Sequence, residues 1–425
     1  MPISVQSIMT LNNPSIAFLP AALAGFVGAD DTADALTQSY VYGRRNILSL
    51  YNSPGSYGVG RLLKSLARSH FWDGLHAGAS IDPDAFTQAV AKTRGPKFTA
   101  AFSGTSIEST GEIANILATH CKNLPIEGVA EGRVTTPFAV TIANLYHTPS
   151  SEEHPTLKAN APFLPILASV GASAACAAIG DWHCFSMIVL GMFCNAATST
   201  ALRTGDLTFT RPNTTPGAPA GDGFLEIGNE IVVLQGSESA VGSVTRGRFS
   251  LRFPSEKALG RLATCATMST FQCLAQLFIV PQGTLLGQLF FVLSLAIAWL
   301  YNSFMASAAK KAKAKVVVDD VLKTPSMQRY SLGSRSAMAV FLMQVLKPAN
   351  VEEQLAALIP NKTRVWTAWR QIVARRLRDE KPTFEATVRP AGTENFSPEE
   401  STLLHTLLGD AQAAVNVYGA ARGRY

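Results

Sequence analysis

The stretch LATCATMSTFQCLAQLFIVPQGTLLGQLFFVLSLAIAWLYNSFMASAA at residues 262–309 decides the fold, because its 48 residues include no Asp, Glu, Lys or Arg. A helix needs about 20 mainly apolar residues to cross about 30 Å of hydrocarbon. The turn Pro281-Gln282-Gly283 divides the stretch into Leu262–Val280 and Thr284–Phe304, and each part has that length. A soluble core helix seldom runs so far without one charge. The stretch therefore predicts two membrane-spanning helices joined as a hairpin.

A second pair of apolar segments precedes it, at Pro162–Gly180 and Cys184–Leu202, separated only by Asp181, Trp182 and His183. Together the two pairs predict an all-α integral membrane protein with four transmembrane helices in two hairpins. The predicted division is a mainly helical cytosolic region at 1–161, a hairpin at 162–202, a cytosolic loop at 203–261, a hairpin at 262–307 and a helical cytosolic tail at 308–425.

Several local patterns refine this plan. The apolar run 15–29 is short for a span and suits a re-entrant or interfacial segment better. Helices are predicted at Arg61–Phe71, after Asp82-Pro83, and after a capping box at Ser109–Glu112. Alternation through Val244–Phe253 predicts a strand, paired with Glu230–Leu234 across a turn at 235–239. This pairing would form a small β-hairpin at the membrane surface.

The tail is basic, with 18 Lys or Arg against 11 Asp or Glu in residues 308–425. The run Lys310–Lys315 follows the last span directly, which favours anionic lipid headgroups over nucleic acid as its partner. Helices are predicted at Arg335–Leu346, at Lys362–Arg378 and after the capping box Ser397-Pro398-Glu399-Glu400. The middle helix carries Trp366 and Trp369 on its apolar face. That face either lies in the headgroup layer or packs on other helices.

Two hairpins place both termini and the central loop on one side of the membrane. Basic residues flank the spans on that side, which predicts that it is cytoplasmic; they are Arg203, Arg261, Lys310, Lys311, Lys313 and Lys315. The glycosylation acceptors Asn213, Asn361 and Asn395 should then stay unmodified. No Lys or Arg precedes Arg44, so a secretory signal peptide is not indicated.

Polar residues inside the spans are the best candidate site residues. Gln272, Gln276 and Asn195 could line a permeation path, or they could form hydrogen bonds between helices of a bundle. The spans contain no acid, base or histidine, which disfavours a proton pump or coupled transporter. Most of the cysteines lie in or beside the spans without a Cys-x-x-Cys pair, and they are interpreted as small apolar residues.

Other motifs indicate no chemistry. His70 and His76, with Asp73 between them, match no zinc spacing and do not share a helical face. The segment Gly55–Gly60 lacks the ending of a phosphate loop and is predicted to be a flexible loop. Ser103–Ser106 is not a nucleophile elbow. No catalytic residue, metal ligand or cofactor is predicted.

The central third of the chain resembles a family of multi-pass membrane proteins that recurs in mushroom-forming fungi. The resemblance lies in Gly205–Thr210, Gly221–Gly223, Ser243–Phe253, Pro281–Gln288 and Trp299–Asn302. It covers roughly residues 163–307 and neither end of the chain. It implies a membrane protein and supplies no catalytic or ligand-binding residue.

Three functions remain open at this point. The first is a non-enzymatic membrane scaffold or interaction protein. The second is an oligomeric channel lined by Gln272, Gln276 and Asn195, since four spans need several copies to form a pore. The third is a membrane-bound enzyme, for which the sequence offers no matched set of reactive residues.

Overall fold

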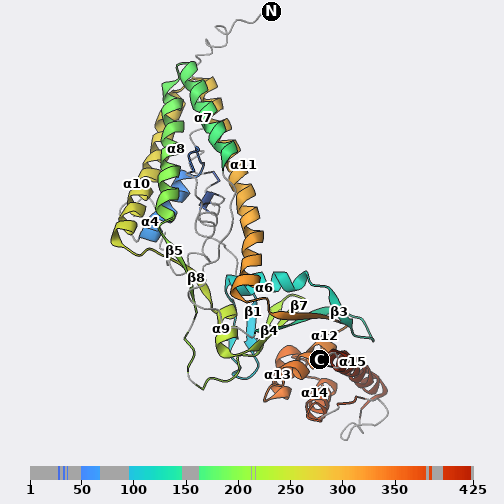
Figure 1. Cartoon of the computed structure of the whole chain (residues 1–425). Helices are drawn as coiled ribbons and strands as arrows, with labels where there is room; N and C mark the ends of the chain where they lie inside the picture. The colour runs from blue at the N-terminus through green and yellow to red at the C-terminus, as the bar shows by residue number, and fades with distance from the viewer. Residues whose placement is uncertain are drawn as a thin grey trace, which may run out of the picture. The chain divides into compact units, whose positions relative to one another are not determined.

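The computed structural model describes residues 27–28, 32–33, 36, 49–67, 95–145, 162–379 without 212 and 216, 382–384 and 396–422. The chain divides into two compact units, each assembled from three separate stretches (Figure 1). Unit 1 comprises Met1–Lys92, Ser151–Thr210 and Phe249–Val316, and unit 2 comprises Thr93–Ser150, Arg211–Arg248 and Val317–Tyr425. Each unit is described by itself below.

Unit 1 is a bundle of helices, drawn in green, yellow and orange with α4 in blue (Figure 1). Its helices are α4 (Ser56–Ala67), α7 (Phe163–Ala178), α8 (Trp182–Leu202), α10 (Glu256–Ile279) and α11 (Leu285–Val316). Helix α4 and α8 both pack on α10, and α7 packs on α8 and α11. The strands β5 (Asp206–Thr210) and β8 (Arg248–Arg252) pair with each other, one after α8 and the other before α10.

Three of the described helices are long and apolar enough to cross a membrane, at Trp182–Leu202, Glu256–Gln282 and Leu285–Ala308. The expectation of four such helices was therefore wrong. Helix α7 has 16 residues, which reach about 24 Å at 1.5 Å per residue. It begins after Pro162, and Gly180 with a φ of +75° follows its end. These two residues limit its length.

Unit 2 is built on a mixed sheet of seven strands, so the expectation of an all-α protein was wrong. The strand order is β2-β1-β6-β7-β4-β9-β3. Strand β4 is parallel to β7 and antiparallel to β9, and β3 is parallel to β9. The strands are β1 (Lys97–Ala100), β2 (Ser106–Ile107), β3 (Ile126–Val129), β4 (Phe138–Leu145), β6 (Gly223–Ile227), β7 (Glu230–Gly236) and β9 (Ser326–Leu332).

The sequence patterns did not predict the sheet, and the reason is physical. Its neighbours come from stretches far apart in the chain: Val140 of β4 lies between Ile231 of β7 and Tyr330 of β9. A central strand buried on both faces shows an apolar run rather than alternation. The run Phe138–Leu145 is of this kind, and periodicity alone does not separate such a run from a helix.

The predicted β-hairpin was also placed on the wrong strands. The hairpin in this loop joins β6 to β7 through Gly228 and Asn229, with Gly228 at a φ of +60°. Ser237 then caps helix α9 (Glu238–Thr245) by accepting a hydrogen bond from the amide of Ala240 at 3.2 Å. Val244 and Thr245, at the start of the predicted strand Val244–Phe253, therefore belong to helix α9. Only Arg248–Arg252 of that predicted strand is extended, as β8.

The core of unit 2 lies between the sheet and a group of helices. Helix α12 is buried along its whole length and packs on α15. Trp369 is 0% exposed, and its Nε1 donates a hydrogen bond to the carbonyl of Leu407 at 3.2 Å. The tryptophan-bearing face thus packs on protein. The helices are α6 (Glu112–Lys122), α9, α12 (Arg335–Leu346), α13 (Val351–Leu358), α14 (Arg364–Arg376) and α15 (Pro398–Arg422).

The predicted helix starts had mixed outcomes. Ser397 and Glu400 form the expected capping box, each side chain accepting from the other residue's amide at 3.1 and 3.0 Å. The helix predicted after Ser109–Glu112 is present as α6, but the predicted capping box is not. The Thr110 hydroxyl donates to the carbonyl of Pro96, and Gly111 is the N-cap. The predicted flexible loop was wrong from Ser56 onward, where α4 begins. Asp82-Pro83, His70, His76 and most of 15–29 lie outside the described residues.

Candidate functional site

The outside of the unit 1 bundle is strongly apolar. Large side chains on every long helix point outward and are about half exposed or more; they include Phe163, Leu164, Leu167, Phe193, Phe271, Phe278, Leu293, Leu300 and Phe304. So many exposed large apolar side chains are unfavourable in water and indicate a contact with lipid or protein. Most of them lie on helices long enough to cross a membrane, which is compatible with lipid.

The bundle buries two apolar clusters and, between its helices, a polar region around the chain segment at residues 49–56. Asn52 is buried. Its backbone amide donates to Ser169 Oγ of α7 at 2.9 Å, and its side-chain Nδ2 donates to Ser294 Oγ of α11 at 3.1 Å. On α8, a Cβ on Gly191 would collide with Asn52 Oδ1. The glycine therefore provides the space that lets the Asn52 side chain enter the bundle.

Two further asparagines hold the segment in place. Asn195 of α8 donates from Nδ2 to the carbonyls of Ser49 and Tyr51, at 3.1 and 3.2 Å. Asn302 of α11 accepts from the Tyr51 hydroxyl at 2.8 Å and donates to Ser53 Oγ at 3.1 Å. These bonds satisfy backbone and side-chain groups that hydrocarbon would leave without partners.

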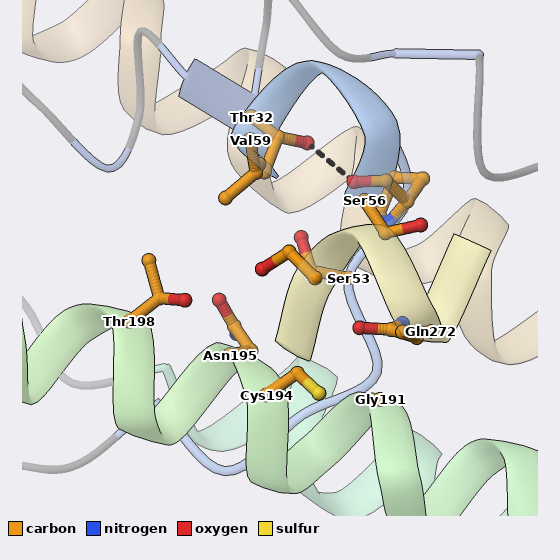
Figure 2. Close-up of a pocket in the computed structure, with 11 residues that line it drawn as sticks. Thr32, Ser53, Ser56, Val59, Gly191, Cys194, Asn195, Thr198 and Gln272 are labelled. Atoms are coloured by element: carbon orange, nitrogen blue, oxygen red, sulfur yellow. Dashed lines mark hydrogen bonds between the residues drawn. The ribbon is translucent and has the colours of Figure 1, made fainter. Parts of the chain in front are cut away.

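A small hollow lies beside this segment (Figure 2). Its volume is about 20 Å³, room for a single water molecule, and Ser53, Asn195 and Gln272 are among the residues that line it. Nearby, Ser56 donates to Gln276 Oε1 at 3.4 Å. All three predicted site residues thus come together around the 49–56 segment.

Sequence reasoning missed the segment itself and two of its partners. Ser294 and Asn302 stand inside the last span as polar residues, so a signal for them existed. For Tyr51 and Asn52 no such signal existed, because a polar sequence outside the spans reads as an ordinary loop. Polar residues on several spans did indicate that something polar must lie between them.

A second polar feature joins the two short turns of the bundle. Asp181, 3% exposed, accepts from the amide of Cys184 at 3.0 Å and from the amide and hydroxyl of Thr284 at 2.7 and 2.8 Å. A Cβ on Gly287 would collide with the Asp181 carboxylate. The carboxylate therefore fastens the α7–α8 turn to the start of α11.

The chemistry available at these positions is hydrogen bonding. The side chains that form the hydrogen bonds described around the 49–56 segment are amides and hydroxyls. Across the part of the chain that the structure describes, no group of three His, Cys, Asp or Glu is placed to hold a metal ion. Ser103 donates to Thr105 Oγ1 at 2.9 Å in the exposed β1–β2 connection. The site is suited to holding a chain segment in the bundle.

Comparison of the chain with protein-family models, with curated proteins and with solved structures finds no match. The resemblance to a fungal membrane-protein family stays a prediction. The candidate spans and their apolar outer surface identify the chain as a membrane protein at the coarsest level.

Proposed function

We propose that this protein is a multi-pass integral membrane protein that acts as a non-enzymatic scaffold or interaction protein. Its lipid-facing bundle would anchor the α/β domain formed by unit 2. The observation that carries the proposal is the assembly of one sheet from three stretches of chain that the apolar helices separate.

The sheet restricts the number of membrane crossings. Strands β7 and β9 each pair directly with β4, which supports a location of the three strands on the same side of a membrane. The chain would then cross the membrane an even number of times between β7 and β9. Two candidate spans, Glu256–Gln282 and Leu285–Ala308, lie between these strands.

We therefore propose that α10 and α11 cross the membrane as a hairpin, with the paired strands on one side and the turn at Gln282 on the other. Arg261 and the run Lys310–Lys315 flank this hairpin on the side of the strands, which favours the cytoplasm for that side. The placement of both termini there is part of the proposal.

The polar interior favours the scaffold over the channel. Asn195 and Gln276 bond to the 49–56 segment, so a path lined by them would require that segment to leave the bundle. Reconstituted vesicles should accordingly show no ion conductance above that of empty vesicles. A conductance that Asn195→Leu alters would replace the scaffold with the channel.

The basic tail supplies a proposed partner, the anionic lipid headgroup. Helix α14 buries Val365 and Trp369 and exposes Arg364 and Arg375, and Arg378 is exposed two residues after the helix ends. The contribution would be electrostatic, about 1 kcal/mol for each base near an anionic surface, and salt would weaken it. Removal of all three charges should lower the binding of the purified chain to phosphatidylserine vesicles, while binding to neutral vesicles stays unchanged.

Site-directed labelling tests the topology. Gln282 and Lys362 are both exposed, one in the α10–α11 turn and the other before α14. The native cysteines are buried, so Gln282→Cys and Lys362→Cys should give clear signals with a membrane-impermeant maleimide. The two variants should label from opposite sides of sealed vesicles. Labelling of both from the same side would overturn the proposed hairpin.

A further inference from the structure

Strand β3 (Ile126–Val129) forms an open edge of the unit 2 sheet, since it pairs only with β9 among the described strands. The amide of Ala130 donates to Ser331 of β9 at 2.8 Å, so by alternation the amide of Val129 points away from the sheet. Ile126 and Val129 are 50% and 66% exposed. An exposed edge with apolar side chains is a template for another strand.

A hollow of about 260 Å³ lies between β3 and the C-terminal part of α15. Glu127, Val129 and Glu131 line it from the β3 side, and Asn416 and Val417 line it from α15. Both charged residues in its lining are acidic. The nearby Arg133 is engaged with the buried Asp410, at 2.8 Å. An occupant of this hollow would therefore meet two carboxylates beside a small apolar patch.

We propose that this edge binds an extended basic peptide segment of a partner protein, which adds to the sheet as a strand beside β3. In an extended chain every second side chain lies on one face. Glu127, Val129 and Glu131 are two residues apart and all line the hollow, although the register with β9 shifts at Glu127 and Glu131 lies two residues beyond the end of β3. The peptide should therefore carry Lys or Arg, then a small apolar residue two positions on, then Lys or Arg after two more. Backbone hydrogen bonds would supply affinity and the hollow would supply selectivity.

A second copy of this chain fits the edge poorly. Pairing of β3 with β3 would bring Glu127 and Glu131 of one copy close to the same residues of the other. Like charges directly opposite each other on neighbouring strands are destabilising. The charge pattern thus distinguishes a basic partner from self-association.

The test uses the full-length chain in nanodiscs of neutral lipid and a fluorescent peptide, Ser-Thr-Lys-Thr-Val-Thr-Lys-Thr-Ser. A matched peptide with Glu in place of both Lys residues serves as the control. The basic peptide should bind roughly tenfold more tightly or better, measured by fluorescence anisotropy. The double variant Glu127→Lys with Glu131→Lys should reverse that preference. Equal binding of both peptides, or no binding of either, would overturn the proposal.

A second pair of variants tests strand addition. Val129→Pro removes the outward amide without removing a bond to β9, whereas Val129→Ala keeps the amide. The proline variant should lose peptide binding and the alanine variant should keep most of it. Equal binding by the two would exclude an added strand. The inference rests on the proposed interaction role, but the labelling of Gln282→Cys tests topology separately, so each can fail alone.

Discussion

The two units of this protein differ most in their outer surfaces. Unit 1 exposes large apolar side chains such as Phe193, and it buries amides such as Asn52 and Asn195 beside its apolar clusters. Unit 2 buries Phe341 and Trp369 and exposes charged residues. Burial of apolar surface drives folding only where the outside is water. The apolar outer surface of unit 1 therefore fits lipid, where hydrogen bonds and close packing hold helices together.

Buried polar groups occur in unit 2 as well. Asp410 of α15 accepts hydrogen bonds from Arg133 and from Ser336 of α12. This network links two helices over an apolar core. In unit 1 the polar contacts surround the 49–56 segment, which makes the following substitutions informative.

The largest effect is expected for Trp369→Ala. Trp369 is fully buried in unit 2 and bonded to Leu407, and truncation of such a residue costs about 3–5 kcal/mol. Unit 2 should become sensitive to protease at a lower temperature. Trp366→Ala is the control, because Trp366 is only partly buried and should cost less. If the two variants melted alike, the assignment of Trp369 to the core would be wrong.

The next effect separates the outer surfaces of the units. Phe193 is 61% exposed on α8 and Leu403 is 37% exposed on α15. Phe193→Asp places a charge among lipid tails, at about 2.5–3.5 kcal/mol on insertion scales, whereas Leu403→Asp places one in water. The fraction of chain that resists carbonate extraction should fall for the first variant only. A membrane fraction that Phe193→Asp leaves intact would argue against lipid at this face.

A smaller effect is expected inside the bundle. Asn195→Leu leaves the carbonyls of Ser49 and Tyr51 without their donor, at about 1–2 kcal/mol. The 49–56 segment should then loosen, and a cysteine introduced as Ser53→Cys should react faster with maleimide than it does beside an intact Asn195. Ser186→Ala, which removes an exposed local bond on the same helix, should leave the rate unchanged. Equal rates in all three backgrounds would show that Asn195 does not hold the segment.

The sequence predicted the bundle better than the sheet, and the reason is the range of the signals. The apolar helices α8, α10 and α11 are local features that hydropathy reads directly. Helices α12 and α14 followed from amphipathic spacing, within two residues at each end. The sheet depends on pairs such as Val140 with Ile231 and with Tyr330, about 90 and 190 residues apart, and no local pattern encodes them.

The candidate site shows the same division. Asn195, Gln272 and Gln276 stood out because polar residues are rare in spans. Their partner Asn52 did not stand out, because its polarity is unremarkable outside a span. The partners of these polar residues depend on tertiary contacts, which the local sequence does not encode.

The smallest effect on the stability of unit 2 at neutral pH is expected at Cys121 of α6, whose effect appears at alkaline pH. Burial in unit 2 raises the pKa of its thiol from 9.0 to about 12, and its Sγ lies 3.7 Å from Met327 Sδ. The unfolded chain would release this proton near pH 9.0 and the folded chain only near pH 12. The stability contributed by the neutral thiol is therefore complete below pH 9 and is lost as the pH rises toward 12.

Removal of the thiol should flatten that alkaline loss. The free energy of unfolding of unit 2 should fall less between pH 8 and 10.5 in Cys121→Ala than in the unchanged chain, although the alanine variant starts lower because it leaves a cavity. Cys121→Val, which fills more of that space, should start higher and show the same flatter slope. The cysteines of unit 1 are present in all three chains, so they cancel in the comparison. Rapid alkylation of Cys121 by iodoacetamide at pH 8.5 in the folded protein would contradict the buried, neutral thiol, because only the thiolate reacts.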